Sequence, residues 1–355
     1  MKKLIILTDE QSEFLVSRAD VKGYTSMDVS KIKDYFVSRG YSVRICKFSD
    51  LDLTENFKGI FILYQSSETQ GGFYKRYIEN LIYHLEKQGA IALPNHEFLK
   101  AHHDKVFMEF LRSGFTDDSL KTIKSFCYGS WVDARNYNSG FPVVIKIASG
   151  SGSSGVYLAK NKVEYDQLVK EAGKVLIAKG PIDLLTGYFK KAAKRMIKYL
   201  YPSKKKYYWK YNTTPDSMPI VVQTFVEGLS GDYKVLIFGK KYFLLYRSNR
   251  ENDFRASGSG KFYDVPEKDH EGLLRYARKI NTEIDFPIIG MDIGFDGKEY
   301  HLIEFQMIDI GTSALQRSDY WHEFHDGKWI RYDGKSDLEE EFSGSIYDYI
   351  EFNHR

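Results

Sequence analysis

The chain has 355 residues, of which 43% are hydrophobic and 28% are charged, and its formal net charge is +3. This composition is typical of a globular protein, and the length exceeds what one ordinary core serves, so we expect two or three subdomains. The small positive charge argues against a dedicated nucleic-acid-binding protein, and two cysteines, Cys46 and Cys127, exclude a disulfide framework.

The sequence also carries no sign of a targeting or membrane segment. Near the start, an apolar run of only four residues precedes the first acids, which is far short of a signal-peptide core. No run approaches the roughly 18 apolar residues of a membrane span. We therefore expect a cytoplasmic protein.

Short apolar runs alternate with helical patterns in residues 1–95. The pattern predicts strands at 4–7, 42–46, 60–64 and 90–93 and helices at 27–38 and 73–87. Gly40 and Gly89 each follow a predicted helix, as glycines at helix C-termini do. The alternation predicts a small α/β domain with a parallel sheet.

Residues 96–220 contain a glycine-rich loop between two strands. A helix is predicted at 97–113, strands within 123–160 and a helix at 163–174. Lys146 lies on an apolar strand that runs into the loop Gly150-Ser151-Gly152-Ser153-Ser154-Gly155. Glycines let the backbone approach an anion, and N–H groups, hydroxyls and a lysine bind it, so the loop predicts a flexible cover over nucleotide phosphates.

Three familiar glycine loops do not fit this context. A dinucleotide-binding loop opens a helix, whereas Val156 and Tyr157 continue as a strand. A Walker A loop needs Lys-Ser or Lys-Thr after its last glycine, and a protein kinase has its lysine on a later strand. A solvent-exposed hairpin without a ligand is the alternative.

Residues 189–210 form a basic block, with nine lysines and arginines, no acid and, after Phe189, five tyrosines and tryptophans. One interpretation is a surface for an anionic partner, such as a glycan, a lipid headgroup or a nucleic acid. The other is a solvated basic insertion, because charge runs usually face water.

The pattern from residue 220 onward is rich in strands, predicted at 220–225, 233–238, 242–247, 289–295 and 300–305, with one helix at 267–281. The first strand leads to Glu227 and Gly228. The backbone of Thr224, Phe225 and Val226 could bind an adenine edge and Glu227 a ribose, although many strands end in Glu-Gly.

Asp292 and Glu304 lie on two strands that Asp296-Gly297 joins as a hairpin. An unpaired carboxylate is costly among apolar neighbours, so a divalent cation is a natural partner for both, and salt-bridged strand acids are the alternative. Arg247, Arg250 and Arg255 follow the strand at 242–247 and suit oxyanion binding, with a plain surface loop as the alternative.

Two histidine pairs remain. His322 and His325 stand three apart in an aromatic segment, which indicates a packed lid or sheet edge more than a metal site. His102 and His103 precede Lys105 on the predicted helix, and we interpret them as structural.

Together these segments resemble the ATP-grasp superfamily, over residues 90–315, and look closest to the branch of ribosomal-protein glutamate ligases and glutathione synthetases. The matching segments, in the order of the family, are Asn95–Lys105, Val144–Lys146 with the glycine loop, Gln223–Glu227, Gly231–Leu236, Asp253–Arg255, Gly290–Ile293 and Ile303–Gln306.

The resemblance implies a mixed α/β fold. It implies a Rossmann-like domain at 1–95, a first ATP-grasp subdomain at 96–220 with a basic insertion at 180–215, and a second subdomain at 221–355. It also implies a ligase that uses ATP and Mg²⁺, in which a carboxylate becomes an acyl phosphate that an amine or thiol captures. Small-molecule or polymer carboxylates and amines are the implied substrates, and an anionic, glycan-like one is expected at the basic block.

The resemblance assigns roles to residues of three kinds. The implied ATP-binding residues are Lys105, Lys146, Gly150, Ser151, Gly152, Ser153, Ser154, Gly155, Gln223, Thr224, Phe225, Val226, Glu227 and Asp232. The implied metal ligands are Asp292, Glu304 and Gln306, and the implied catalytic residues are Lys234, Arg247 and Arg255.

The chain departs from the family at three places. Gln306 replaces a metal-binding asparagine, Lys234 replaces a common arginine, and 306–313 replaces the usual Asn-x-x-Pro-Gly continuation. The alternatives to a ligase are an ATP-grasp kinase acting on a small molecule or glycan, a non-catalytic nucleotide-binding module and, less favoured, a nucleic-acid-binding protein that uses 189–210.

Overall fold

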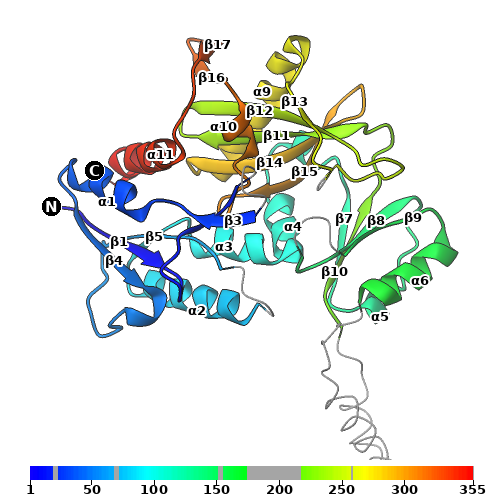
Figure 1. The fold of residues 1–355 in the computed structure, drawn as a ribbon. Helices are drawn as coiled ribbons and strands as arrows, with labels where there is room; N and C mark the ends of the chain where they lie inside the picture. The colour runs from blue at the N-terminus through cyan, green and yellow to red at the C-terminus, as the bar shows by residue number, and fades with distance from the viewer. Residues whose placement is uncertain (19–22, 68–71, 151–154, 174–216, 257–258, 355) are drawn as a thin grey trace, which may run out of the picture. The chain divides into compact units, whose positions relative to one another are not determined.

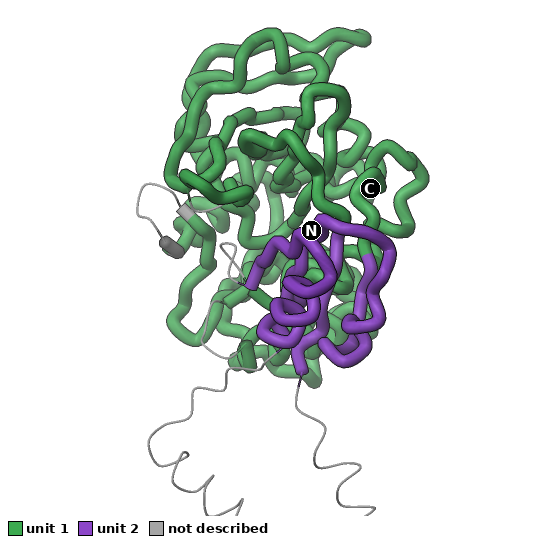
Figure 2. The backbone as a smooth tube through the Cα atoms, turned by 90° about the vertical axis from the view of Figure 1, so that its right-hand side faces the viewer, with its two compact units in different colours: residues 1–125, 149–154, 224–355 green, residues 126–148, 155–223 purple. Residues whose placement is uncertain are grey.

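The computed structural model describes residues 1–18, 23–67, 72–150, 155–173, 217–256 and 259–354. The chain forms two compact units, which Figure 2 colours separately. Unit 1 comprises 1–125, 149–154 and 224–355, and unit 2 comprises 126–148 and 155–223. The domain boundaries at 95/96 and 220/221 stay a prediction.

The N-terminal part of unit 1 is a four-stranded parallel sheet in the order β4-β1-β5-β6. Its strands are β1 (Lys3–Thr8), β4 (Ser42–Lys47), β5 (Phe61–Tyr64) and β6 (Ile91–Leu93), and its helices are α1 (Val29–Val37), α2 (Phe73–Lys87) and α3 (His96–His103). A 3₁₀ turn (Phe48–Asp50) follows β4, and β2 (Leu15–Arg18) pairs with β3 (Gly23–Ser26). The predicted α/β domain with a parallel sheet is confirmed.

The central strands of this sheet, β1 and β5, are apolar and buried on both faces. All four residues of β5 are buried, as in parallel sheets that are covered on both sides. Gly40 and Gly89 have φ values of +85° and +87°, which other residues rarely adopt, so each glycine allows the sharp turn from a helix into the next strand.

The single helix predicted at 97–113 is wrong, because the chain forms two helices there. Asp104 ends α3 in an extended conformation (φ −137°, ψ 108°) and begins α4 (Lys105–Ser113). Its carboxylate accepts hydrogen bonds from the N–H groups of Val106 and Phe107, as an N-cap aspartate does. Lys105 therefore stands at the first position of α4.

The rest of unit 1 is built on a seven-stranded antiparallel sheet in the order β15-β14-β11-β12-β16-β17, with β13 also paired to β12 (Figure 1). Its strands are β11 (Gly231–Phe238), β12 (Lys241–Ser248), β13 (Phe262–Tyr263), β14 (Ile288–Phe295), β15 (Tyr300–Gln306), β16 (Tyr320–His325) and β17 (Lys328–Asp333). The helices are α9 (Glu267–Ile284), α10 (Ser313–Arg317) and α11 (Leu338–Asn353), and a 3₁₀ turn lies at Asp118–Leu120. The strands predicted between 233 and 305 and the helix at 267–281 are confirmed.

One hydrophobic core joins the two sheets of unit 1. It contains Leu4 and Ile6 of β1 as well as Val235 and Ile237 of β11, all of them 0–1% exposed. Figure 1 shows α11 beside α1, where the ring of Tyr347 lies 6.3 Å from that of Tyr35. Burial of this apolar surface makes the two sheets one structural unit.

Unit 2 is a four-stranded sheet in the order β7-β10-β8-β9 with two helices. The strands are β7 (Ser125–Tyr128), β8 (Val143–Ile147), β9 (Val156–Ala159) and β10 (Ile220–Thr224), and the helices are α5 (Trp131–Ala134) and α6 (Lys162–Ala172). β8 and β9 form the predicted antiparallel hairpin, in which Lys146 pairs with Val156.

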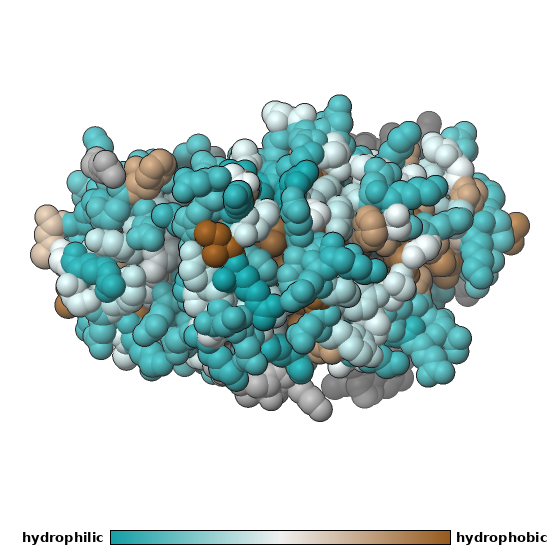
Figure 3. Space-filling model, turned by 90° about the horizontal axis from the view of Figure 1, so that it is seen from above, coloured by the Kyte–Doolittle hydropathy of each residue, from teal (hydrophilic) through white to brown (hydrophobic). Residues whose placement is uncertain are grey.

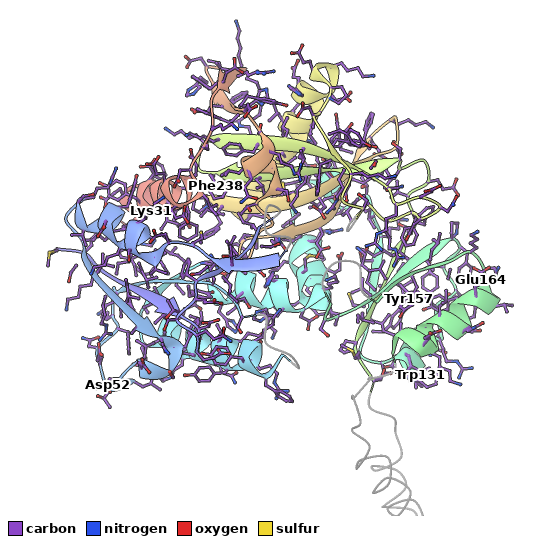
Figure 4. All side chains as sticks on the ribbon, viewed as in Figure 1. Lys31, Asp52, Trp131, Tyr157, Glu164 and Phe238 are labelled. Carbon is purple, nitrogen blue, oxygen red and sulfur yellow. The ribbon has the colours of Figure 1, made fainter. Side chains whose placement is uncertain are left out.

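Helix α6 begins with reciprocal hydrogen bonds. Asn161 accepts from the N–H of Glu164, and the Glu164 carboxylate accepts from the N–H of Lys160, at 3.0 and 2.9 Å. Figure 4 labels Glu164 on this helix and Tyr157 on β9. These bonds satisfy N–H groups that have no partner inside a helix.

Among the described residues, no helix is both long and apolar enough to cross a membrane. The face of the molecule drawn in Figure 3 is mostly hydrophilic, with scattered apolar residues. Single apolar residues on a surface are ordinary and indicate no interface.

Candidate functional site

Four neighbouring strands of the large sheet place charged side chains in register. Asp232 of β11 lies opposite Arg247 of β12, and Lys234 of β11 lies opposite Asp292 of β14. Asp292 in turn lies opposite Glu304 of β15. Because alternate residues of a strand face the same side, the pairing brings these five groups to one face of the sheet.

Arg247 binds two carboxylates at once. Its Nε and one terminal nitrogen donate to the two oxygens of Asp232 at 2.8 and 2.6 Å, and that nitrogen also donates to Asp292 at 2.9 Å. Lys234 Nζ lies 3.4 Å from the other oxygen of Asp292. The side chains of Arg247 and Asp232 are only 9% and 8% exposed, so these charges interact with little screening.

The electrostatics separate the two aspartates. Burial, together with the nearby charge of Asp292, raises the pKa of Asp232. Burial alone would also raise the pKa of Asp292, but the positive charges of Lys234 and Arg247 outweigh it and lower that pKa. Asp292 is therefore held as a carboxylate, the form that binds a metal ion.

Lys105 connects α4 to the same acids. Its Nζ lies 3.5 Å from Glu304 Oε1 and donates to the carbonyl oxygen of Gly150 at 2.6 Å. Protein cations therefore pair with both carboxylates in this structure, and the metal-binding role of Asp292 and Glu304 stays a prediction. Asp292 and Glu304 form ion pairs with Lys234, Arg247 and Lys105, as the salt-bridge alternative expected.

The donor set nevertheless fits Mg²⁺. Asp292 and Glu304 face each other across two strands, and the Glu304 side chain is 36% exposed, so one carboxylate is accessible. Carboxylate and amide oxygens are the ligands that this cation prefers.

Gln306 lies on the same face of β15 as Glu304 but is engaged elsewhere. Its Nε2 donates to the carbonyl oxygen of Asp309 at 3.3 Å, and its side chain forms a hydrogen bond with His102. Burial lowers the pKa of His102 well below the ordinary value, so its ring is neutral near pH 7. Gln306 as a metal ligand stays a prediction.

The segment after β15 reaches the N-terminal sheet. The N–H of Asp309 donates to Gln65 Oε1 at 2.9 Å, and Asp309 Oδ2 lies 3.8 Å from His102 Nε2. Sequence reasoning missed Gln65 and Asp309. The available signal was the polar run Gln65-Ser66-Ser67 directly after the buried strand β5, because ligands bind at the carboxyl ends of parallel strands.

Comparison with solved structures shows which known proteins resemble this chain in their fold. A crystal structure of the D-cycloserine synthetase DcsG matches 98% of this chain and 99% of its own, with a TM-score of 0.52 and 10% identity. The ATP-grasp ligase PsnB with minimal precursor, Mg and ADP matches 98% of both chains (TM-score 0.46, 10% identity). D-alanine–D-alanine ligase from Bacillus anthracis matches 88% of this chain and 89% of its own (0.47, 10%).

The chain shares its overall fold with the D-cycloserine synthetase DcsG. No protein-family model matches it, and a search of curated proteins finds no match. The expected mixed α/β fold class is confirmed, whereas membership of the ATP-grasp superfamily and the closer branch stay predictions.

Arg255 pairs with an acid of its own loop. Its Nε donates to Asp253 Oδ1 at 3.0 Å and one terminal nitrogen donates to Oδ2 at 2.6 Å, so the pair is bidentate. Arg247 is occupied by Asp232 and Asp292 as described. The geometry thus favours Arg247 as a residue that holds the acids in place, and the catalytic roles of Arg255, Arg247 and Lys234 stay predictions.

In unit 2, Lys146 is buried on β8 and Gln223 is buried near the end of β10. Gly155 has a φ of +70°, and a Cβ there would lie 2.4 Å from the Ile147 side chain, so only glycine fits without a shift. Residues Ser151, Gly152, Ser153 and Ser154 lie outside the described residues, as do the basic block at 189–210 and the insertion at 180–215.

The segment predicted to bind adenine follows β10. The N–H of Thr224 donates to the carbonyl oxygen of Lys124 at 3.0 Å, so this donor already has a partner. The ring of Phe225 lies 6.0 Å from that of Phe254. The next residues, Val226 and Glu227, are half-buried and exposed, respectively. They are therefore better placed than Thr224 to contact a ligand.

The aromatic segment near the C-terminus forms the hairpin β16–β17 at the edge of the large sheet, as one interpretation expected. His322 is buried there, and its ring lies 4.9 Å from that of His270. Burial lowers the pKa of His322 to about 4, so it packs as a neutral ring. His325 pairs instead with Glu323 at 2.9 Å.

Two further features lie away from the charged face. Ligand atoms of Asp296, Glu299 and His301 lie within 4.8 Å of one another at the turn between β14 and β15. A polar groove of about 890 Å³ is lined by α1, α11 and the β11–β12 turn, including Lys31 and Phe238 (Figure 4). Neither contains a residue that the sequence assigned to ATP or metal.

Proposed function

We propose that the protein is an ATP- and Mg²⁺-dependent ligase that joins a carboxylate to an amine through an acyl phosphate. The observation that supports this most is the charged face of the large sheet, on which Asp292 and Glu304 face each other with three cations around them. Phosphoryl transfer needs little from the protein except positioned charges of both signs.

Asp292, Glu304 and Gln306 would hold Mg²⁺, which neutralises charge on the β- and γ-phosphates when it is bound. Lys105 and Lys146 bind phosphate oxygens, and the glycine loop at 150–155 covers them. Arg247 keeps Asp292 ionised and in place through the bonds described above. Lys234 and Lys105, now paired with the two acids, turn to phosphate oxygens when ATP is bound.

The carboxylate of the first substrate attacks the γ-phosphorus, so a carboxyl oxygen–phosphorus bond forms and ADP leaves. The amine then attacks the acyl carbon, and phosphate departs with the electron pair of the carbon–oxygen bond. Binding and orientation of the two substrates supply much of the rate, since they convert bimolecular steps into unimolecular ones.

The test is release of ADP with a panel of the twenty amino acids as carboxylates, in the presence of Mg²⁺ and hydroxylamine. Hydroxylamine captures an acyl phosphate as a hydroxamate, which mass spectrometry identifies. Asp292→Asn is the inactive control. ADP release with a stable phosphorylated product would indicate a kinase, and absence of any hydrolysis above background would indicate a nucleotide-binding module.

We also propose that the basic block at 189–210 attracts the acidic or glycan-like substrate and has no part in binding ATP. Nine positive charges with five tyrosine and tryptophan side chains suit such a partner, and the block lies outside every segment assigned to the nucleotide.

A further inference from the structure

Three side chains of unit 1 form a continuous hydrogen-bonded chain that the charged face does not include. Ser66 Oγ lies 2.6 Å from His103 Nε2, and His103 Nδ1 lies 2.5 Å from Glu79 Oε1. Ser66 follows β5, Glu79 belongs to α2 and His103 ends α3, so three separate elements bring them together. A hydroxyl, an imidazole and a carboxylate are thus linked in that order.

The order of the groups fixes the direction in which a proton can move. An ionised carboxylate only accepts hydrogen bonds, so His103 Nδ1 carries the proton that faces Glu79. In the neutral ring Nε2 then has a free electron pair, which accepts the Ser66 hydroxyl. A proton that leaves Ser66 is received by His103, and Glu79 stabilises the resulting imidazolium.

The hydrogen-bonded series Ser66–His103–Glu79 lies beside the segment that follows β15. Gln65, the neighbour of Ser66, accepts from the N–H of Asp309 at 2.9 Å. The ring of His103 is 5.3 Å from that of His102, whose side chain bonds to Gln306, two residues beyond Glu304. Residues 306–313 are also where the sequence departs from the ATP-grasp pattern.

The Ser66 and His103 members of this hydrogen-bonded series are shielded from water. Ser66 is 3% exposed, and the His103 side chain is 5% exposed. An acyl phosphate is easily hydrolysed, so a base that activates the acceptor must not activate bulk water as well. A buried base reached through a single hydroxyl meets this requirement.

We propose that Ser66, His103 and Glu79 form a proton relay that deprotonates the amine acceptor, an inference that rests on the proposed function. The acceptor ammonium gives a proton to Ser66 Oγ as Ser66 gives its own to His103 Nε2. The freed electron pair of the nitrogen forms the carbon–nitrogen bond. The carbon–oxygen bond to phosphate breaks, and phosphate leaves with the electron pair of that bond. The second proton lost from nitrogen goes to the departing phosphate. Ser66 touches the acceptor, whereas His103 and Glu79 are positioning residues that act through it.

The experiment separates the two half-reactions. Hydroxylamine is largely uncharged near neutral pH and needs no base, whereas the α-amino group of an amino acid must lose a proton. Each variant, His103→Gln, Ser66→Ala and Glu79→Gln, is tested with the amino-acid panel in both assays. We expect hydroxamate formation within about twofold of wild type and peptide formation reduced about 10²–10⁴-fold, the usual contribution of general base catalysis.

The pH profile adds a readout that a structural role would not change. Other titratable groups near His103 are Glu79 of α2 and His96 and His102 of α3, and Lys75 of α2 acts on the neighbouring His102. In His103→Gln, the peptide-forming rate should rise about tenfold per pH unit up to the pKa of the acceptor's amino group, because only the free amine reacts. Hydroxamate formation should not show this rise.

His96→Gln on the same helix is the matched control and should behave as wild type in both assays. Equal losses of hydroxamate and peptide, or no loss of either in a folded variant, would overturn the relay. A wild-type protein that forms no hydroxamate would instead overturn the proposed function, and the relay with it. Thermal unfolding of each variant shows whether it folds. If His103→Gln does not fold, Ser66→Ala, which removes only one oxygen atom, tests the relay in its place.

Discussion

Arg247 is the residue whose removal should disturb the fold most. In Arg247→Met, the carboxylates of Asp232 and Asp292 lose three charged hydrogen bonds, of 2.8, 2.6 and 2.9 Å, while Asp232 stays buried and Asp292 half-buried. Removing one partner of a buried ion pair typically costs about 3–5 kcal/mol, because the remaining charge is uncompensated. We expect a loss of that size in the free energy of unfolding at pH 7, measured by urea denaturation.

The matched control is Arg275→Met. Arg275 pairs with Glu271 one helical turn away, but both side chains are more than 70% exposed. Such a pair contributes about 0.3–0.5 kcal/mol. If the Arg247 variant lost no more than this control, the buried network would not stabilise the fold, and the reasoning from burial and hydrogen bonding would be refuted.

The loss should also depend on pH in a defined direction. Without Arg247, the pKa of Asp232, already raised by burial, rises further, and that of Asp292 rises as well. A folded-state pKa above the unfolded value favours the folded state at low pH. The difference between wild type and variant should therefore shrink as the pH falls from 7 towards 4.

Four further predictions concern single groups. Lys146→Ala should weaken ATP binding tenfold or more in calorimetry, as loss of a charged hydrogen bond of roughly 1.5–3 kcal/mol implies, and unchanged affinity would exclude its phosphate role. Asp292→Asn and Glu304→Gln should each abolish Mg²⁺-dependent turnover, and wild-type hydrolysis in either would make that acid structural. The pKa of His322 is about 4 in the folded protein and 6.5 in the unfolded chain. The free energy of unfolding should therefore rise with pH between these values, by about 3 kcal/mol in total. In His322→Gln, the free energy of unfolding, measured by urea denaturation, should change less with pH over this range. Replacing the lysines at 204–206 with serine should leave ATP affinity within about twofold, or roughly 0.4 kcal/mol. The KM of the acceptor should rise, and this rise should be smaller at high salt, which screens the attraction. Equal losses for ATP and acceptor would contradict the substrate role.

Local patterns predicted the elements of this protein well. Helix α2 begins and ends where its apolar spacing places it, and the antiparallel strands between 233 and 305 follow from their apolar runs. The break at Asp104 was missed, because the apolar spacing continues through it and one capping side chain decides the outcome. Periodicity describes which face is apolar, whereas a helix end depends on a single residue.

The site shows the same division. Asp292 and Glu304 were assigned as an opposed pair from the hairpin that joins them, and their register agrees. The bonds of Arg247 to both Asp232 and Asp292 depend on β11 lying between β12 and β14, an order that chain sequence alone does not give. The chain of Ser66, His103 and Glu79 was invisible for the same reason, since each residue comes from a different element.

The packing of α11 against α1 has a consequence for how the protein is made. Residues 29–37 leave the ribosome roughly 300 residues before the helix that packs against them, 338–353. At roughly 5–20 residues per second, the early segment waits on the order of tens of seconds for its cover. During that time Phe14 and Phe36, both fully buried in the finished fold, lack the aromatic partners Phe342 and Tyr347. Nascent chains should therefore expose this apolar surface until residues 338–353 have been synthesised.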